Sequence, residues 1–420
     1  MGTIRHSRPL RTVTRRLGSV AVVVALCAGG GVALQGQALA APAPETVAID
    51  GVDYPNPLRR DDGGAVTTVA DWEGVRRAEL LEAFQENVYG RSLPAPTAQT
   101  FGVAQSEVGG VRRKIVTITL TGPRGTRRIE VPLFLPAARP AGTFLMIDHR
   151  GAVDEDPARS SDYAPVSTIV KAGYAFVALR TDDLAPDGGD YRDGVIDLFH
   201  PAGEELPADA GRAISAWAWG ASRVMDYLET DPDVDAAKVA VLGHSRSGKA
   251  ALWAGAQDTR FAAAVANDAG STGTALARRS GGGEGGESVA QLTRAFPHWF
   301  PPVYRAYGDR VDELPVDQHQ LLALMAPRRV VVGSATEDAN ADPEGEFLAY
   351  RAAAPVYALY GLGDTGLAST AWPPAADQGF RGPAMSYHLR SGGHGLTAAD
   401  WTNYLDGDLF AAVGAAPVQG

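Results

Sequence analysis

The sequence predicts an α/β fold, a three-layer sandwich in which helices cover both faces of a mostly parallel central sheet. The first observation is a set of short, almost continuously apolar segments, which is typical of strands buried on both faces. They are residues 143–148, 174–179, 238–242, 261–267 and 328–333. The second observation is that stretches with helical apolar spacing, such as residues 211–229, separate these segments.

Residues 1–40 have the composition of a secretory signal peptide. They carry five arginines and no acidic residue, then an apolar stretch, and they end in Ala-Leu-Ala at Ala40. We therefore expect an exported protein, cleaved near Ala40, with residues 41–420 as a single domain. Cys27 is the one cysteine and leaves with the signal, so the exported chain has no disulfide and depends on its core for stability.

The exported chain is acidic. Without the five arginines of the signal it has 33 basic against 49 acidic residues, a formal charge of −16. Such an excess of negative charge disfavours general binding to nucleic acid or to an anionic membrane surface. We expect neither as a partner, and we expect a monomer.

Three further segments complete the predicted order of elements. Residues 41–62 are rich in proline and aspartate and are expected to lie across the surface. Residues 72–90 have helical spacing and end on a glycine, and from about residue 112 strand patterns predict an antiparallel start to the sheet. The glycine-rich residues 280–287 are expected to form a flexible loop.

The segment Gly-His-Ser-Arg-Ser-Gly-Lys, residues 243–249, stands where an apolar strand ends and a helix begins. Ligands of parallel sheets gather at the carboxyl ends of the strands, and a sharp strand-to-helix turn can present a serine hydroxyl there. Gly243 supplies the small residue that this turn needs, although the second glycine of the general pattern is displaced by one position to Gly248. Ser245 is either a nucleophile or a helix cap, and we favour the nucleophile.

A serine nucleophile needs a histidine as its base. His394 is favoured because glycines flank it in a late loop, before a helix expected to begin at Thr397. This placement also gives the chain order serine, acid, histidine. His388 lies in an apolar segment typical of a strand, and His244 adjoins the serine and is expected to point away from it.

Two aspartates are candidates for the acid that orients the histidine. Asp338 follows the strand at 328–333 and is favoured, whereas Asp268, at the end of the preceding strand, is kept as an alternative or auxiliary acid. Asp342 is interpreted as a helix N-cap because proline follows it. Ester cleavage by such residues needs no metal and no cofactor, so we expect neither, and the backbone N–H of Arg246 is the expected oxyanion donor.

At this point the chain resembles the glucuronoyl esterases, carbohydrate esterase family 15, and particularly their bacterial members. The family's nucleophile segment is glycine, one residue, Ser-Arg, one residue, Gly-Lys, which includes the displaced glycine. Further matching segments follow in order over about 160 residues, namely GES at 286–288, FPHWF at 296–300, LPVDQHQLLALMAPR at 314–328, ADPEGEF at 341–347 and GGHGLTAADW at 392–401.

The resemblance implies an α/β-hydrolase fold and an exported serine esterase of the 4-O-methyl-glucuronoyl methylesterase type. Its substrates would be esters of glucuronic or 4-O-methyl-glucuronic acid, as in the links between glucuronoxylan and lignin alcohols. Ser245 matches the family nucleophile, His394 the base, and Asp338 the acid of bacterial members. Asp268 falls where fungal members carry a glutamate.

The resemblance also implies a binding site for the sugar. Lys249 and Glu287 match residues that bind its hydroxyls, and Arg246 matches the arginine beside the oxyanion. Many members have a tryptophan two positions after the acid where this chain has Asn340, which predicts weaker or altered sugar binding.

Two other functions remain as alternatives. An acetyl xylan esterase, or another carbohydrate esterase of this fold, would need no Lys249 and Glu287 pair on the acyl side. A non-catalytic binding protein with the hydrolase fold would typically lose the serine or the histidine, and this chain keeps both.

Overall fold

The computed structural model describes residues 43–201, 203–281, 285–367, 371–407 and 409–413. The predicted signal peptide lies outside these residues and stays a prediction, as does part of the glycine-rich segment. Residues 41–420 group into one compact unit. In the part of the chain that is described, no helix combines the length and the apolar character needed to cross a bilayer.

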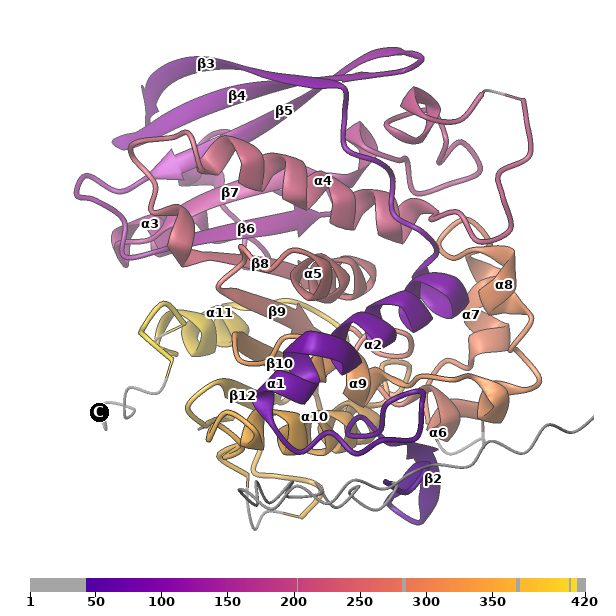
Figure 1. Cartoon of the computed structure of the whole chain (residues 1–420). Helices are drawn as coiled ribbons and strands as arrows, with labels where there is room; N and C mark the ends of the chain where they lie inside the picture. Colours follow the sequence, from indigo (N-terminus) through magenta and orange to yellow (C-terminus); the bar gives the residue numbers. More distant parts are fainter. Residues whose placement is uncertain (1–42, 202, 282–284, 368–370, 408, 414–420) are drawn as a thin grey trace, which may run out of the picture. The chain divides into compact units, whose positions relative to one another are not determined.

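The core of the fold is a ten-stranded sheet (Figure 1). The strands β12, β10, β9, β8, β6 and β7 are parallel to one another, and β5, β4 and β3 continue the sheet in antiparallel fashion. The predicted antiparallel start and parallel centre are therefore confirmed. In spatial order the strands are β11 (Gln378–Arg381), β12 (Met385–Arg390), β10 (Arg329–Ala335), β9 (Ala263–Asn267), β8 (Val239–His244), β6 (Thr143–Asp148), β7 (Ala175–Arg180), β5 (Gly125–Leu135), β4 (Val111–Gly122) and β3 (Ala98–Val108).

Helices cover both faces of this sheet, which gives the predicted three layers. Side chains alternate across a strand, so Phe144 and Met146 of β6 pack on one face and Leu145 and Ile147 on the other. The first face is covered by α3 (Val166–Lys171) and α11 (Ala398–Leu405). The second is covered by α4 (Ala213–Leu228), α5 (Arg246–Gln257), α9 (Gln318–Ala323) and α10 (Pro343–Ala358).

The remaining helical segments are short. The chain between β9 and β10 holds α6 (Ala277–Gly281), α7 (Val289–Ala295) and α8 (Pro302–Arg305). Single 3₁₀ turns occur at Pro157–Arg159, Thr181–Asp183, Ile196–Leu198, Ala236–Lys238 and Val311–Glu313. Two caps agree with the sequence, since Thr397 caps α11 and the Asp342 side chain accepts from Gly345 N to cap α10.

The N-terminal segments differ in part from the expectation. The helix predicted at 72–90 is present as α2 (Arg77–Phe84) and the π-helical turns Trp72–Arg76 and Gln85–Tyr89, and the helical segment begins before the predicted start, with α1 (Val69–Asp71). The preceding surface segment also contains an unpredicted hairpin of β1 (Thr46–Ile49) and β2 (Val52–Pro55). Its turn residues, Asp50 and Gly51, have φ values of 49° and 78°, the pairing that a two-residue hairpin favours.

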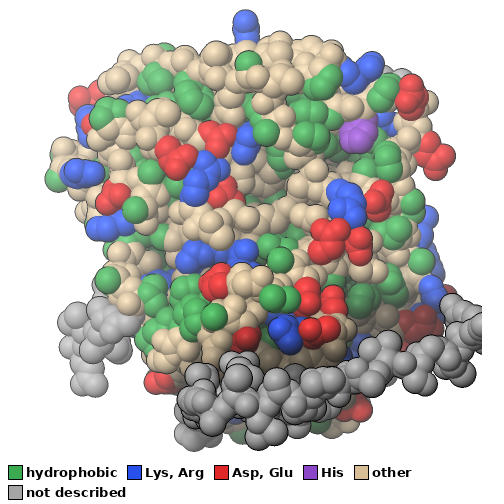
Figure 2. All heavy atoms as spheres, viewed as in Figure 1, with side chains coloured by type: hydrophobic (Ala, Val, Ile, Leu, Met, Phe, Trp, Pro, Cys, Tyr) green, Lys and Arg blue, Asp and Glu red, His purple; other side chains and the backbone are tan. Residues whose placement is uncertain are grey.

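The charge of the chain does not gather in one place on the face that Figure 2 shows. Acidic and basic side chains are interspersed there between apolar ones. On this face, the surplus of acidic residues therefore forms no large patch of a single sign.

Candidate active site

Ser245 lies on a sharp turn between β8 and α5. Its φ of 57° and ψ of −126° are in a region that non-glycine residues rarely occupy, and its side chain makes no capping hydrogen bond to α5. A Cβ atom at Gly243 would lie 2.0 Å from the Ser247 carbonyl oxygen, so only glycine fits there. The turn thus has the form predicted for a nucleophile, and the helix-cap interpretation of Ser245 is not supported.

The displaced glycine has its own packing reason. A Cβ atom at Gly248 would lie 2.9 Å from the Cβ of Ala269 in the chain after β9, so α5 approaches that chain closely. Ser247, which takes the usual glycine position, is buried and its hydroxyl donates to the His244 carbonyl at 3.1 Å. Serine in place of glycine at position 247 therefore keeps the turn and adds a hydrogen bond within it.

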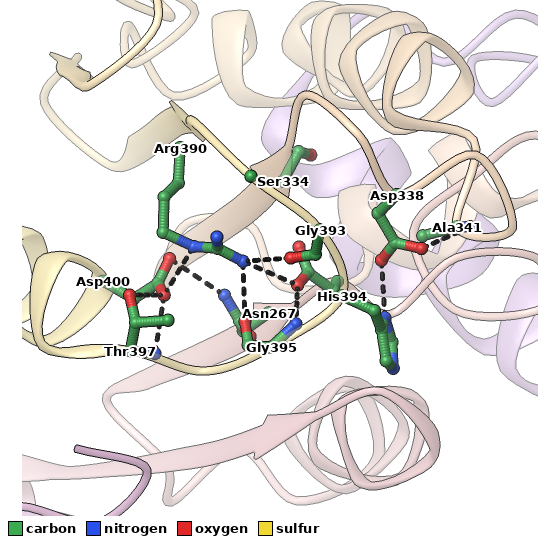
Figure 3. A network of polar contacts seen from close by, with 12 residues as sticks. Asn267, Ser334, Asp338, Ala341, Arg390, Gly393, His394, Gly395, Thr397 and Asp400 are labelled. Atoms are coloured by element: carbon green, nitrogen blue, oxygen red, sulfur yellow. Dashed lines mark hydrogen bonds and ion pairs between the residues drawn. The ribbon is translucent and has the colours of Figure 1, made fainter.

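His394 and Asp338 form a direct pair (Figure 3). The distance from His394 Nδ1 to Asp338 Oδ2 is 2.5 Å. The Asp338 side chain is 3% exposed and that of His394 is 42% exposed, so a buried acid holds a solvent-facing ring. A carboxylate only accepts, so Nδ1 carries the hydrogen and Nε2 is left as the basic nitrogen.

Asp268 lies close to this pair but makes different hydrogen bonds. Its Oδ2 accepts from the backbone N–H of Gly395 at 3.0 Å and from Arg390 Nη2 at 3.3 Å. Its Oδ1 has no hydrogen-bond partner among the described residues. Burial raises the pKa of Asp268 well above its usual range. Asp268 therefore binds the backbone of the loop that carries His394, whereas Asp338 binds the His394 ring.

Arg390, the last residue of β12, holds the same loop in place through hydrogen bonds to its carbonyls (Figure 3). Its Nη2 donates to the carbonyls of Gly393 at 2.8 Å and Gly395 at 2.9 Å, and its Nε donates to Asp400 at 3.0 Å. Sequence reasoning missed Arg390 and Asp400. No motif marks them, because an arginine at a strand end has many ordinary uses.

Lys249 is buried one turn into α5. Its Nζ donates to the carbonyls of Ala269 at 2.6 Å and Ser271 at 2.5 Å. Burial lowers its pKa to about 8. These contacts exclude a solvated surface lysine, and the side chain is still mostly protonated at neutral pH.

Asp187 fixes Arg246, the residue after the serine. Its carboxylate accepts from Arg246 Nη1 at 2.5 Å, from His298 Nε2 at 2.8 Å and from Trp299 Nε1 at 2.7 Å. The guanidinium also lies 4.7 Å from the Trp299 ring centroid. Burial alone would raise the pKa of Asp187, but these three donors outweigh it and lower the pKa. Sequence reasoning missed Asp187.

A cavity of about 220 Å³ joins these groups. It brings together every site residue predicted from the sequence, and its lining also includes the aromatic side chains of Phe296 and Trp299. A larger groove of about 790 Å³, between the N-terminal hairpin and α10, holds none of the predicted residues. The smaller cavity is lined by Ser245, Arg246, Lys249, Asp268, Ala269, Gly270, Ser271, Glu287, Phe296, Trp299, Asp338, Asn340, Ala341 and His394.

One group of side chains in the described residues has a spacing that a metal ion could use. Asp268, Asp338 and His394 offer ligand atoms within 4.8 Å of one another. The hydrogen bond between Asp338 and His394 explains that closeness without a metal. The expectation of a metal-free site stays a prediction.

Comparisons with known proteins identify several relatives. The family model described as glucuronyl esterase, fungi, matches residues 161–361. A carbohydrate esterase from an unknown prokaryotic organism is 35% identical over an alignment of 388 residues, which covers 84% of this chain and 88% of that protein. The 4-O-methyl-glucuronoyl methylesterase 1 of Wolfiporia cocos is 32% identical over an alignment of 317 residues, which covers 74% of this chain and 72% of that protein.

A solved structure is also similar to this chain. The glucuronoyl esterase from Solibacter usitatus superposes with a TM-score of 0.77 and is 37% identical. The match covers 85% of this chain and 97% of that chain. The predicted α/β-hydrolase fold is therefore confirmed.

Proposed function

Because this chain belongs to the glucuronoyl esterases of carbohydrate esterase family 15, which are carboxylic ester hydrolases, we propose that Ser245, His394 and Asp338 form its catalytic triad. The substrates are esters of glucuronic and 4-O-methyl-glucuronic acid. The observation that supports this most is that the triad and the predicted sugar-binding residues line one cavity.

The reaction follows from the arrangement. Ser245 Oγ attacks the ester carbonyl carbon while His394 Nε2 takes the hydroxyl proton. The tetrahedral intermediate collapses, the C–O bond to the alcohol breaks, and His394 returns the proton to the leaving oxygen. Water then attacks the acyl-enzyme in the same way, which releases the uronic acid and restores the serine. Asp338 keeps the hydrogen on Nδ1 and stabilises the imidazolium.

The oxyanion of each intermediate is stabilised beside Arg246. Its backbone N–H is the first of α5, and the first amides of a helix have no partner within the helix. The guanidinium adds a fixed positive charge because Asp187 and the Trp299 ring hold it in place. The salt bridge between Arg246 and Asp187 is thus part of the site rather than a surface contact.

Lys249 and Glu287 bind the hydroxyls of the sugar ring. An ammonium group has three N–H donors, and the carbonyls of Ala269 and Ser271 take two, which leaves one for the substrate. Glu287 supplies acceptors, and its backbone N–H donates to the Asn340 carbonyl at 3.0 Å. Asn340 is exposed at the cavity, so the polar amide replaces an aromatic contact to the sugar.

The natural substrate that fits these features is a glucuronoxylan esterified to lignin alcohols. This polymer lies outside cells, which agrees with the export predicted from residues 1–40. A charged lysine and a carboxylate on the acyl side favour a uronate over an acetate, which carries no hydroxyls to bind.

The test compares benzyl glucuronate with benzyl acetate as substrates of the wild type and of Ser245→Ala. We expect the wild type to prefer the glucuronate. The variant should lose both activities because the nucleophile is gone, and it should keep its fold because a half-buried hydroxyl contributes little packing. A phosphonate probe should label Ser245 in the wild type alone. Preference for the acetate would favour an acetyl esterase, and a wild type that is neither active nor labelled would favour the binding protein.

A further inference from the structure

The exposed ring of His394 packs on a second histidine. The ring centroids of His244 and His394 are 4.5 Å apart, with an angle of 42° between the ring planes. His244 is fully buried, ends β8 and immediately precedes Ser245. Its ring contacts the His394 ring.

Hydrogen bonds fix the protonation of His244. Asn267 Nδ2 donates to an Asp400 carboxylate oxygen at 3.2 Å, so the Asn267 amide oxygen faces His244. That oxygen lies 2.7 Å from His244 Nδ1 and only accepts, so Nδ1 carries a hydrogen. Arg150 Nη2 lies 3.1 Å from His244 Nε2, and a guanidinium only donates, so Nε2 is an acceptor. The ring is neutral in one tautomer.

The other groups around the ring agree with a neutral state. His149 packs on it with ring centroids 6.1 Å apart, and Tyr163 meets it edge-on at 5.9 Å. Burial lowers the pKa of His244 to about 2, and the charge of Arg150 and the neighbouring rings of His394 and His149 act in the same direction, while the hydrogen bond to Asn267 opposes the shift. His244 thus stays uncharged over the range in which an esterase works.

We propose that His244 is a positioning residue for the general base, a ring held in one neutral tautomer by Asn267 and Arg150, on which the His394 ring packs. The inference rests on the proposed role of His394. Asp338 fixes one edge of the His394 ring, and His244 fixes one face. Together they direct His394 Nε2 towards Ser245. When His394 is protonated during the reaction, its positive charge lies beside the neutral ring of His244.

Two variants separate the ring from its hydrogen bonds. His244→Asn keeps a donor for Asn267 but removes the ring, whereas His244→Phe keeps a ring and removes the donor. We expect kcat on a glucuronate ester to fall by about tenfold to a hundredfold in His244→Asn with little change in KM, because a misplaced base slows chemistry and not binding. His244→Phe should recover most of this loss despite a lower Tm.

His319→Asn is the matched control, because His319 is also fully buried but lies in α9 with its Nε2 at 2.9 Å from the Pro55 carbonyl. It should lower Tm and leave kcat unchanged. A wild-type kcat in His244→Asn, or a lower kcat in His244→Phe than in His244→Asn, would overturn the proposal. Activity remaining in Ser245→Ala or His394→Ala would instead refute the triad itself.

A measurement on the wild type does not depend on how the variants fold. With ¹⁵N-labelled histidine, the NMR signals of His244, assigned by their loss in His244→Phe, should report a neutral ring with hydrogen on Nδ1 from pH 5 to 8. A signal that titrates in this range, or that reports hydrogen on Nε2, would refute the fixed tautomer and with it the proposal.

Discussion

Asp338→Asn should reduce esterase activity far more than Asp268→Asn. Asp338 Oδ2 lies 2.5 Å from His394 Nδ1, so the substitution removes a charge-assisted bond. Such a bond contributes roughly 1.5–3 kcal/mol, or about tenfold to a hundredfold in rate. If the new amide nitrogen faces Nδ1, the ring must move its hydrogen to Nε2 and cannot accept the serine proton. Loss of the correct tautomer costs up to about 10⁴-fold.

Asp268→Asn should reduce activity by less than about tenfold, since the substitution keeps an acceptor for both hydrogen-bond donors of Asp268. The Asp268 carboxylate bonds the backbone N–H of Gly395 and the Arg390 guanidinium, and both bonds need only an acceptor. An amide oxygen supplies that acceptor. Burial raises the pKa of Asp268, so replacing its carboxylate with a neutral amide should cost less than it would at an exposed site.

The assay is kcat/KM on benzyl glucuronate at neutral pH, with circular dichroism and Tm to confirm that each variant folds. The reverse ranking would assign the acid role to the end of β9 and refute the reasoning from hydrogen bonds. Near-equal losses, with an inactive double variant, would show that both aspartates orient His394.

Two more predictions follow from buried charges. Lys249→Ala should lower kcat/KM on the glucuronate ester by about tenfold to a hundredfold, for the loss of one charged hydrogen bond, and hardly affect phenyl acetate. Because burial lowers the Lys249 pKa to about 8, the advantage of the wild type should shrink above that pH, and equal losses on both esters would assign Lys249 to the turn instead. Glu346 is fully buried, and burial raises its pKa to about 7. The hydrogen bonds that it accepts from Ser334, Thr274 and the Gly270 N–H favour the carboxylate and oppose this shift. The native state therefore binds the proton more tightly than the unfolded state. The free energy of unfolding of the wild type should fall as the pH rises from about 4.5 to 7, by roughly 1–3 kcal/mol more than that of Glu346→Gln. Urea unfolding at pH 5 and pH 8 measures this, and a difference between the two proteins that does not change with pH would contradict it.

The parts of the site that could be predicted from the sequence are those whose geometry is local. Gly243 and Ser245 belong to one turn, and the contact that forbids a side chain at Gly243 involves Ser247, four residues away. His394 was found because glycines beside it leave the ring exposed on a loop. Such signals lie within a few residues, so a single sequence contains them.

The parts that were missed depend on contacts between distant segments. Asp187 meets Arg246, 59 residues away, and His298, 111 residues away, and it lies in a long connection with no motif. Arg390 reaches Asp268 across 122 residues. Whether such a carboxylate or guanidinium faces the site or the solvent depends on the packing of whole elements, which no local pattern records.

The choice between the two aspartates shows most clearly what could not be predicted from the sequence. β9 and β10 are neighbouring parallel strands, so Asp268 and Asp338 both follow the same edge of the sheet, and strand order alone cannot separate them. What separates them is the path of the chain. Asp268 turns immediately after β9, with φ of 42°, and its carboxylate lies under the histidine loop beside Arg390. Asp338 lies three residues beyond β10, and this extra length carries its carboxylate to the imidazole itself. One acid binds the loop that carries His394 and the other binds its ring, so the two carboxylates divide the task of orienting His394, for which the sequence favoured Asp338 and kept Asp268 as an alternative or auxiliary acid.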